Sequence, residues 1–295
     1  MEERLRKVTD LTRARAVAQK HRALFSSDDA CAANVQRQSV RARAAMSFRL
    51  FDLNPEQELA VRTTEGPLLI LAGAGTGKTR VITARAAFLI AQGVPPEQII
   101  AVTFTNKAAT EMKERLTRLI DPAQAKKVTM STFHALCVRI LRQDIEKLGY
   151  KRNFSIYDEG DTTGLIKKII TRTAAQDEKL DAAVAKSLIS KAKNNGWREV
   201  SPGDEQTLAG AVFARYQAEL KTLNAVDFDD LLLLTVRLLS EHETAREKWQ
   251  RRFRYLMVDE FQDTNRLQLD LVALLARRAD VRANICVVGD VDPSI

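Results

Sequence analysis

Residues 72–79 combine glycine, lysine and threonine at a spacing that suits phosphate chemistry. They follow an apolar run, 68–71, and are Ala72, Gly73, Ala74, Gly75, Thr76, Gly77, Lys78 and Thr79. Glycines let the backbone curl so that successive N–H groups point at phosphate oxygens. In such a loop the lysine reaches the β- and γ-phosphates, and the hydroxyl after it is a ligand for Mg²⁺. The pattern predicts a nucleoside triphosphate site, with Ala72 standing where the pattern has glycine.

A second group of reactive side chains follows the apolar residues 255–258. Asp259 and Glu260 come at the end of a predicted strand, and ligands of open α/β sheets bind at the carboxyl ends of strands. Asp259 suits a Mg²⁺ ion, bound directly or through water. Glu260 points elsewhere and can orient and deprotonate an attacking water. Together with Lys78 and Thr79, these carboxylates predict nucleotide hydrolysis.

Short apolar, β-branched segments alternate with helical patterns from residue 46 onward. Short runs of this kind are typical of strands buried on both faces of a parallel sheet. Strands are predicted at residues 68–72, 99–105, 128–132, 255–259 and 285–289. Helical periodicity over 107–120 and 265–278 lies between them. The succession predicts a doubly wound α/β domain.

Residues 134–224 interrupt this alternation. Helices alone are predicted there, at 135–148, 158–173, 181–194 and 207–223. We therefore expect a discontinuous α/β domain, 46–133 plus 225–295, with an inserted helical subdomain at 134–224. Residues 1–45 are predicted to be a basic extension, either disordered or ahead of a natural start at Met46.

Composition narrows the class of protein further. The 295 residues carry a formal net charge of +8, and residues 1–45 contribute much of it with ten basic and five acidic side chains. Net charge alone is thus weak evidence for nucleic-acid binding. The three cysteines are isolated, which suits a reducing compartment better than a disulfide framework. With no apolar run near the ~20 residues of a membrane span, a cytoplasmic protein is expected.

The segments at 72–79 and 259–264 together resemble the superfamily 1 DNA helicases of the UvrD/Rep/PcrA type. The resemblance extends in order across residues 52–294. It implies a RecA-like domain that binds ATP and Mg²⁺, and a parent activity of ATP-dependent 3′→5′ DNA unwinding. Residues 53–57 resemble the family's adenine-reading element, so Gln57 is expected to read the base, with Arg80 beside it.

Two further segments resemble the single-stranded DNA elements of the same family. In the first, 103–109, Thr103, Thr105 and Asn106 offer polar groups to a phosphate, and Phe104 offers a stacking face to a base. The second, 131–134, adds Thr132, Phe133 and His134 as contact candidates. Residues 227–230 carry three carboxylates, which we assign to the start of a helix rather than to a metal. Protein partners stay unknown.

The last segment, 289–295, departs from the resemblance. The family has glutamine, which senses the γ-phosphate, where this chain has Pro293. Family helicases carry a second α/β domain after this point, so the chain resembles the N-terminal portion of a helicase. We expect it to bind ATP weakly and not to unwind DNA. Alternatives are the front half of a helicase–nuclease subunit or a non-catalytic binding remnant. A P-loop kinase leaves 103–109 and 259–264 unexplained.

Overall fold

The computed structural model describes residues 53–73, 75–173, 180–196, 207–276 and 283–290. The predictions made for residues 1–45, Ala74 and Pro293 lie outside these residues. The chain divides into two compact units. The first consists of residues 1–132, 247–264 and 275–295, and the second of residues 133–246 and 265–274.

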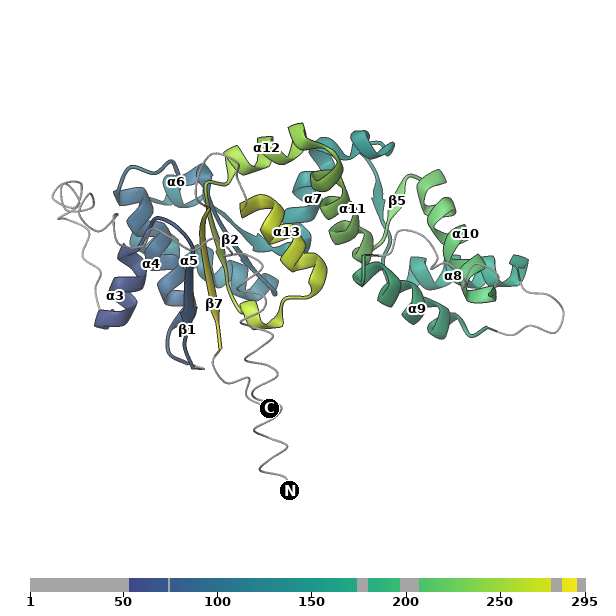
Figure 1. Ribbon diagram of the computed structural model, residues 1–295, viewed down its shortest axis with the longest axis horizontal. Helices are drawn as coiled ribbons and strands as arrows, with labels where there is room; N and C mark the ends of the chain where they lie inside the picture. The colour runs from purple at the N-terminus through teal and green to yellow at the C-terminus, as the bar shows by residue number, and fades with distance from the viewer. Residues whose placement is uncertain (1–52, 74, 174–179, 197–206, 277–282, 291–295) are drawn as a thin grey trace, which may run out of the picture. The chain divides into compact units, whose positions relative to one another are not determined.

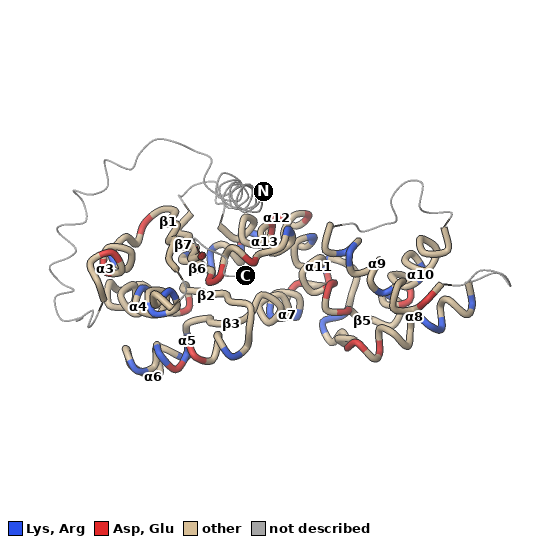
Figure 2. Tube along the Cα trace, turned by 90° about the horizontal axis from the view of Figure 1, so that it is seen from below, with Lys and Arg blue, Asp and Glu red and all other residues tan. Residues whose placement is uncertain are grey.

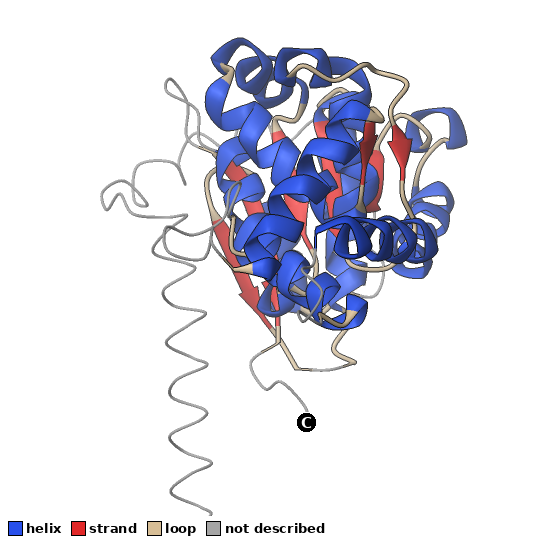
Figure 3. Ribbon diagram, turned by 90° about the vertical axis from the view of Figure 1, so that its right-hand side faces the viewer, coloured by secondary structure: helices blue, strands red, loops and turns tan. Residues whose placement is uncertain are grey.

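The first unit is built on a parallel sheet whose five strands lie in the order β1-β7-β6-β2-β3. The strands are β1 (Leu68–Leu71), β2 (Ile99–Thr103), β3 (Thr129–Thr132), β6 (Tyr255–Val258) and β7 (Asn284–Gly289). Helices separate them along the chain, as Figures 1 and 3 show. The predicted α/β fold with a parallel sheet is confirmed, and each strand lies within three residues of its predicted bounds.

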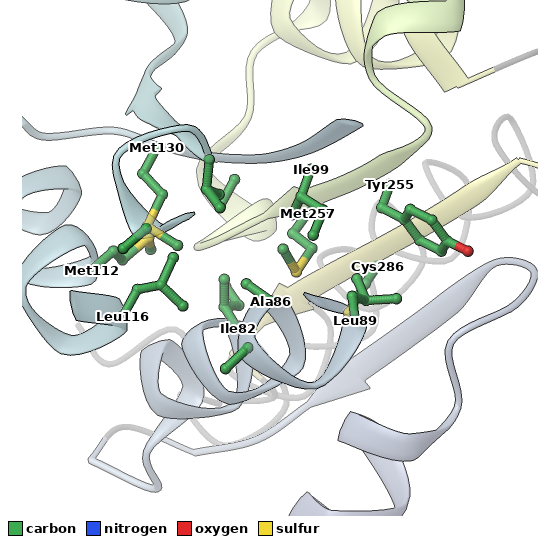
Figure 4. Close-up of a cluster of buried hydrophobic side chains, with 14 of the residues drawn as sticks. Ile82, Ala86, Leu89, Ile99, Met112, Leu116, Met130, Tyr255, Met257 and Cys286 are labelled. Atoms are coloured by element: carbon green, nitrogen blue, oxygen red, sulfur yellow. The ribbon is translucent and has the colours of Figure 1, made fainter. Parts of the chain in front are cut away.

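Helices α4 (Lys78–Ala91) and α5 (Asn106–Leu119) close the main hydrophobic core of this unit. Ile82, Ala86 and Leu89 of α4 pack with Met257 and Cys286 from the sheet (Figure 4). These residues are all at most 1% exposed. The three residues of α4 recur every three or four positions, which places them on one face of the helix. The core thereby packs α4 against the sheet.

Helix α3 (Pro55–Arg62) packs beside α4 and is joined to it by a buried cation. Arg85 of α4 is 2% exposed and donates hydrogen bonds to the carbonyl oxygens of Ala60, Thr63 and Thr64. Burial lowers the pKa of Arg85. The last carbonyls of a helix have no partner within it, and here a guanidinium binds one of them, that of Ala60, and two just after the helix. Short helical turns η1 (Pro96–Gln98) and α6 (Pro122–Ala125) precede β2 and β3.

The second unit consists mainly of helices. They are α7 (Phe133–Asp144), η2 (Ile145–Leu148), α8 (Glu159–Thr173), α9 (Ala182–Asn194), α10 (Leu208–Thr222) and α11 (Phe228–Glu241). Helices α12 (Glu243–Arg252) and α13 (Arg266–Ala276), with η3 (Phe261–Asp263) between them, run across the division of the two units. Acidic and basic positions are mixed along the trace (Figure 2).

Two details of this unit differ from the sequence-based expectation. Helix α11 packs against α7 and α9, so residues 225–246 belong with the helices rather than with the sheet. The expectation of helices alone was wrong, because β4 (Ser155–Ile156) pairs in parallel with β5 (Ala225–Val226). A pairing of two residues per strand leaves no periodic signal in the sequence.

A fully buried lysine lies at the centre of the second unit. The ammonium of Lys193 is 2.6 Å from Asp227 Oδ2 and 2.9 Å from Asp230 Oδ1, and its side chain has no exposed surface. The hydroxyl of Tyr216 donates to Asp227 Oδ2 at 2.8 Å. Asp227 also caps α11 in a capping box with Asp230. Carboxylates predicted for the helix start thus do cap it, and they additionally neutralise a cation from α9.

No helix within the described ranges has the length and apolar character required to cross a membrane.

Candidate functional site

The carboxyl ends of the parallel strands bring the predicted reactive residues of the first unit to one edge of the sheet. Strand β1 is followed by the glycine loop, β7 by Asp290, and β6 by Asp259 and Glu260. Strand β2 then leads into 104–106, and Thr103 is the direct register partner of Thr132 at the end of β3. The edge therefore runs from the loop through three carboxylates to the segments predicted to contact DNA.

The glycine loop adopts backbone angles that side chains rarely tolerate. Gly75 and Gly77 have φ angles of +76° and +86°. The positive φ favours glycine at position 77, and a Cβ there would also lie close to Gln57 Nε2, at 3.3 Å. The Thr76 hydroxyl donates to Gly73 O at 2.7 Å and closes the turn. Helix α4 then begins without a side-chain cap, which leaves its first N–H groups for an anion.

Gln57 contacts the loop directly, a role that the sequence did not indicate. Its Oε1 accepts from the N–H of Asn54 at 3.1 Å and completes the capping box of α3. Its Nε2 donates to the carbonyl of Thr76 at 2.8 Å. Both ends of the amide are thus engaged in holding α3 against the loop. Adenine recognition by Gln57 stays a prediction.

Thr79 and Asp259 form the part of the site that suits a divalent cation. The Thr79 hydroxyl donates to Asp259 Oδ2 at 3.2 Å, and Asp259 is 3% exposed. Burial raises the pKa of Asp259, while the hydrogen bonds from Thr79 and from the Glu260 N–H lower it. Mg²⁺ in nucleotide sites is bound by one or two protein oxygens together with phosphates and waters. A hydroxyl and a carboxylate this close fit that requirement.

Glu260 lies in a strained turn directly after the strand. Its φ of +50° is in the left-handed region, which is uncommon for residues other than glycine. Its N–H donates to Asp259 Oδ1 at 3.1 Å, and its side chain is exposed. Partial burial, followed by the nearby charge of Asp259, raises the pKa of Glu260. The two adjacent carboxylates therefore differ in environment, since Asp259 is buried and Glu260 is exposed.

The partner of Lys78 was not foreseen from the sequence. The Lys78 ammonium forms an ion pair with Asp290 Oδ1, and the two side chains are only 12% and 17% exposed. The N–H of Asp290 in turn donates to Gln262 Oε1 at 3.0 Å. Only the strand register brings these residues together, because Leu71 at the end of β1 pairs with Gly289 at the end of β7.

The first segment predicted to contact DNA is accessible in part. Thr105 caps α5 by accepting from the Ala108 N–H at 3.1 Å, and Asn106 is exposed. Phe104 is half-buried. Its ring is therefore neither fully enclosed in the core nor fully open for stacking on a base. Thr103 has no exposed surface, and its hydroxyl lacks a hydrogen-bond partner among the described residues. A DNA strand could therefore reach three residues of this segment: Phe104, Thr105 and Asn106.

The second segment is mostly buried. Phe133 is 1% exposed and Thr132 is 8% exposed. A ring with no free face cannot stack on a base, so the predicted DNA contact through the Phe133 side chain is not available in this structure. His134 is half-buried and packs edge-to-face against Phe228, with ring centroids 6.0 Å apart. Burial lowers the pKa of His134.

Comparison with known proteins identifies relatives of this chain. Residues 53–295 match the family described as UvrD/REP helicase N-terminal domain. The chain is 46% identical over 252 residues to the ATP-dependent DNA helicase PcrA of Bacillus subtilis, covering 83% of this chain and 34% of that protein. It is 44% identical over 257 residues to the PcrA proteins of Staphylococcus aureus and Staphylococcus epidermidis, covering 85% of this chain. The chain thus spans about a third of the length of these relatives.

Proposed function

Since this chain belongs to the UvrD/REP helicase family, we propose that its first unit binds ATP with Mg²⁺ and hydrolyses it in response to single-stranded DNA. One observation carries the proposal: Lys78, Thr79, Asp259 and Glu260 converge at the same edge of the sheet as segment 103–106. The residues proposed for phosphate, metal and nucleic-acid binding thereby follow the ends of neighbouring strands of one parallel sheet.

Each residue has a proposed part in the reaction. The backbone N–H groups of 72–79 and the Lys78 ammonium bind the phosphates, and Thr79 and Asp259 hold Mg²⁺. The metal neutralises charge on the phosphates when bound. Glu260 accepts a proton from the attacking water. Gln57 and Arg80 border the base, while Phe104, Thr105 and Asn106 border the DNA. A DNA contact by His134, which belongs to the second unit, is a separate proposal.

For the complete protein we propose 3′→5′ unwinding of duplex DNA in the cytoplasm, driven by this hydrolysis. The relatives are named ATP-dependent DNA helicases, which supports the activity but not its polarity. The experiment is ATP hydrolysis with and without single-stranded DNA, followed by unwinding of duplexes that carry a 3′ or a 5′ tail. Lys78→Ala is the blank. Stimulation by DNA and preference for the 3′ tail are expected. ATP binding without any hydrolysis would instead support a non-catalytic remnant, and cleavage of the DNA a helicase–nuclease.

Gln57→Ala is expected to weaken the binding of GTP as well as ATP. In the wild-type protein the Gln57 side chain donates a hydrogen bond to Thr76 O and so helps to orient the loop that every nucleoside triphosphate contacts. The substitution removes this hydrogen bond. Any additional loss for ATP over GTP measures adenine recognition. Titration with both nucleotides tests this, and Glu56→Ala, an exposed neighbour on α3, is the control. Unchanged GTP binding would contradict a role for Gln57 in holding the loop.

A further inference from the structure

We propose that Asp290 is an internal competitor for the phosphate group: it occupies Lys78 in the nucleotide-free protein, is held there by Gln262, and lowers the affinity for ATP. This inference rests on the proposed function, because it concerns the same phosphate-binding lysine. It adds that a carboxylate of the protein itself, Asp290, opposes nucleotide binding. Asp290 directly follows β7, the neighbour of the strand that leads into the loop.

The geometry leaves little room for Lys78 to serve both partners. The ion pair with Asp290 is largely shielded from water, with 12% and 17% of the two side chains exposed. Opposite charges attract more strongly where water is largely excluded, because the local dielectric constant is lower. A lysine ammonium is a compact point charge, so a triphosphate that recruits it must displace the carboxylate or share the cation with it.

Displacement has an electrostatic cost at this edge. Asp290 lies at the end of β7, directly between the strands that end in the loop and in Asp259 and Glu260. When Lys78 turns to a phosphate, the Asp290 carboxylate is left near two other carboxylates and the incoming anion. Like charges in a partly buried site repel, so the free energy of ATP binding is reduced by this carboxylate.

Gln262 fixes Asp290 in the competing position. Its Oε1 accepts from the Asp290 N–H at 3.0 Å, and its Nε2 donates to Asp263 Oδ2 at 2.9 Å. A Cβ on Gly289 would lie 3.2 Å from Gln262 Oε1, so the glycine before Asp290 lets the amide approach. The carbonyl of Gly289 also accepts from the Ala72 N–H at 3.1 Å. The backbone on both sides of the ion pair is therefore held, and Gln262 is a positioning residue.

The test compares nucleotide affinity in Asp290→Asn and wild-type protein. Asparagine keeps the shape of the side chain and removes its charge. We expect ATP to bind on the order of three- to tenfold more tightly to the variant, a range typical of one partly shielded charge pair. The gain is largest without Mg²⁺, when the triphosphate charge is not compensated. Adenosine, which has no phosphate, binds equally to both proteins.

Controls separate competition from a change in net charge or in folding. Glu111→Gln removes one exposed acidic charge from α5 and is expected to leave ATP affinity unchanged. Gln262→Ala is expected to tighten ATP binding less than Asp290→Asn does. The double variant should bind no more tightly than Asp290→Asn alone, because both changes release the same lysine. A damaged fold lowers affinity, so a gain is not produced by misfolding.

Two results would overturn the inference in distinguishable ways. Equal or weaker ATP binding by Asp290→Asn, beside clear binding by wild type, refutes competition and leaves the proposed function intact. If neither protein binds ATP more tightly than Lys78→Ala does, the proposed function fails and the inference fails with it.

Discussion

Glu260→Gln is expected to slow ATP hydrolysis by roughly 10²–10⁴-fold, the usual contribution of a positioned general base. Glutamine has nearly the shape of glutamate but cannot accept the proton of the attacking water. The exposed carboxylate lies beyond Asp259 in a turn with φ of +50°, so the substitution removes the base and leaves the metal-binding oxygen in place. ATP affinity should therefore stay close to that of wild type.

Single-turnover hydrolysis and equilibrium ATP binding together measure this effect. Asp263→Asn, an exposed carboxylate in the same turn, is the matched control and should change the rate only slightly. Loss of ATP binding in Glu260→Gln, in parallel with the rate, would show that Glu260 acts in binding instead.

The pH profile gives an independent signature of the same base. Partial burial, with Asp259 and Asp263 as further causes, raises the pKa of Glu260. A base acts only when it has lost its proton, so the rate should rise with pH through this raised pKa. In Glu260→Gln that acidic limb of the profile disappears. Persistence of the limb would assign it to another group.

Lys193→Met is expected to destabilise the second unit by about 3–5 kcal/mol, the range for removing one partner of a buried ion pair. Lys193 has no exposed surface and lies between Asp227 and Asp230. Methionine fills the same space but leaves two buried carboxylates together without a cation. Urea unfolding measures the loss, and Lys191→Met, exposed on the same helix, should be nearly neutral. A small effect of Lys193→Met would show that the unit relaxes to admit water.

The deficit of Lys193→Met should also depend on pH. Burial raises the pKa of Asp230 to about 6, while Lys193 opposes the rise. Without Lys193 the pKa rises further, so the folded variant keeps a proton that its unfolded chain loses near pH 4. Stability falls with rising pH wherever the folded state binds more protons. The variant therefore loses more stability, relative to wild type, as the pH rises above about 6. A deficit that stays constant as the pH rises would exclude the carboxylate pair as its cause.

Local signals in the sequence were sufficient for the sheet and for half of the site. The five strands are apolar runs bounded by turns, and the glycine loop carries its own spacing, so both could be predicted without tertiary information. The rule that ligands meet the carboxyl ends of parallel strands placed Thr79 beside Asp259. These features need only the order of elements along the chain.

The remaining features depend on contacts that no local pattern encodes. The pairing of Lys78 with Asp290 follows from the register of β1 on β7, which the sequence does not specify. Gln57 proved to be a helix cap and loop contact, because an amide can serve either of those roles as well as bind a base. Phe133 is core, since the helix it starts turns that ring inward. Aromatic type alone does not distinguish a buried ring from a stacking surface.

The position of β7 has a consequence for how the molecule forms. This strand is the last of the five along the chain, yet it lies between β1 and β6 in the sheet. Until it is made, β1 has no neighbour and β6 has an open edge, both of which can pair with other chains. The helical second unit, by contrast, is largely complete earlier along the chain and rests on more local contacts, which assemble faster. We therefore expect the helices of the second unit to form first during synthesis, and the sheet with its phosphate loop only when β7 inserts.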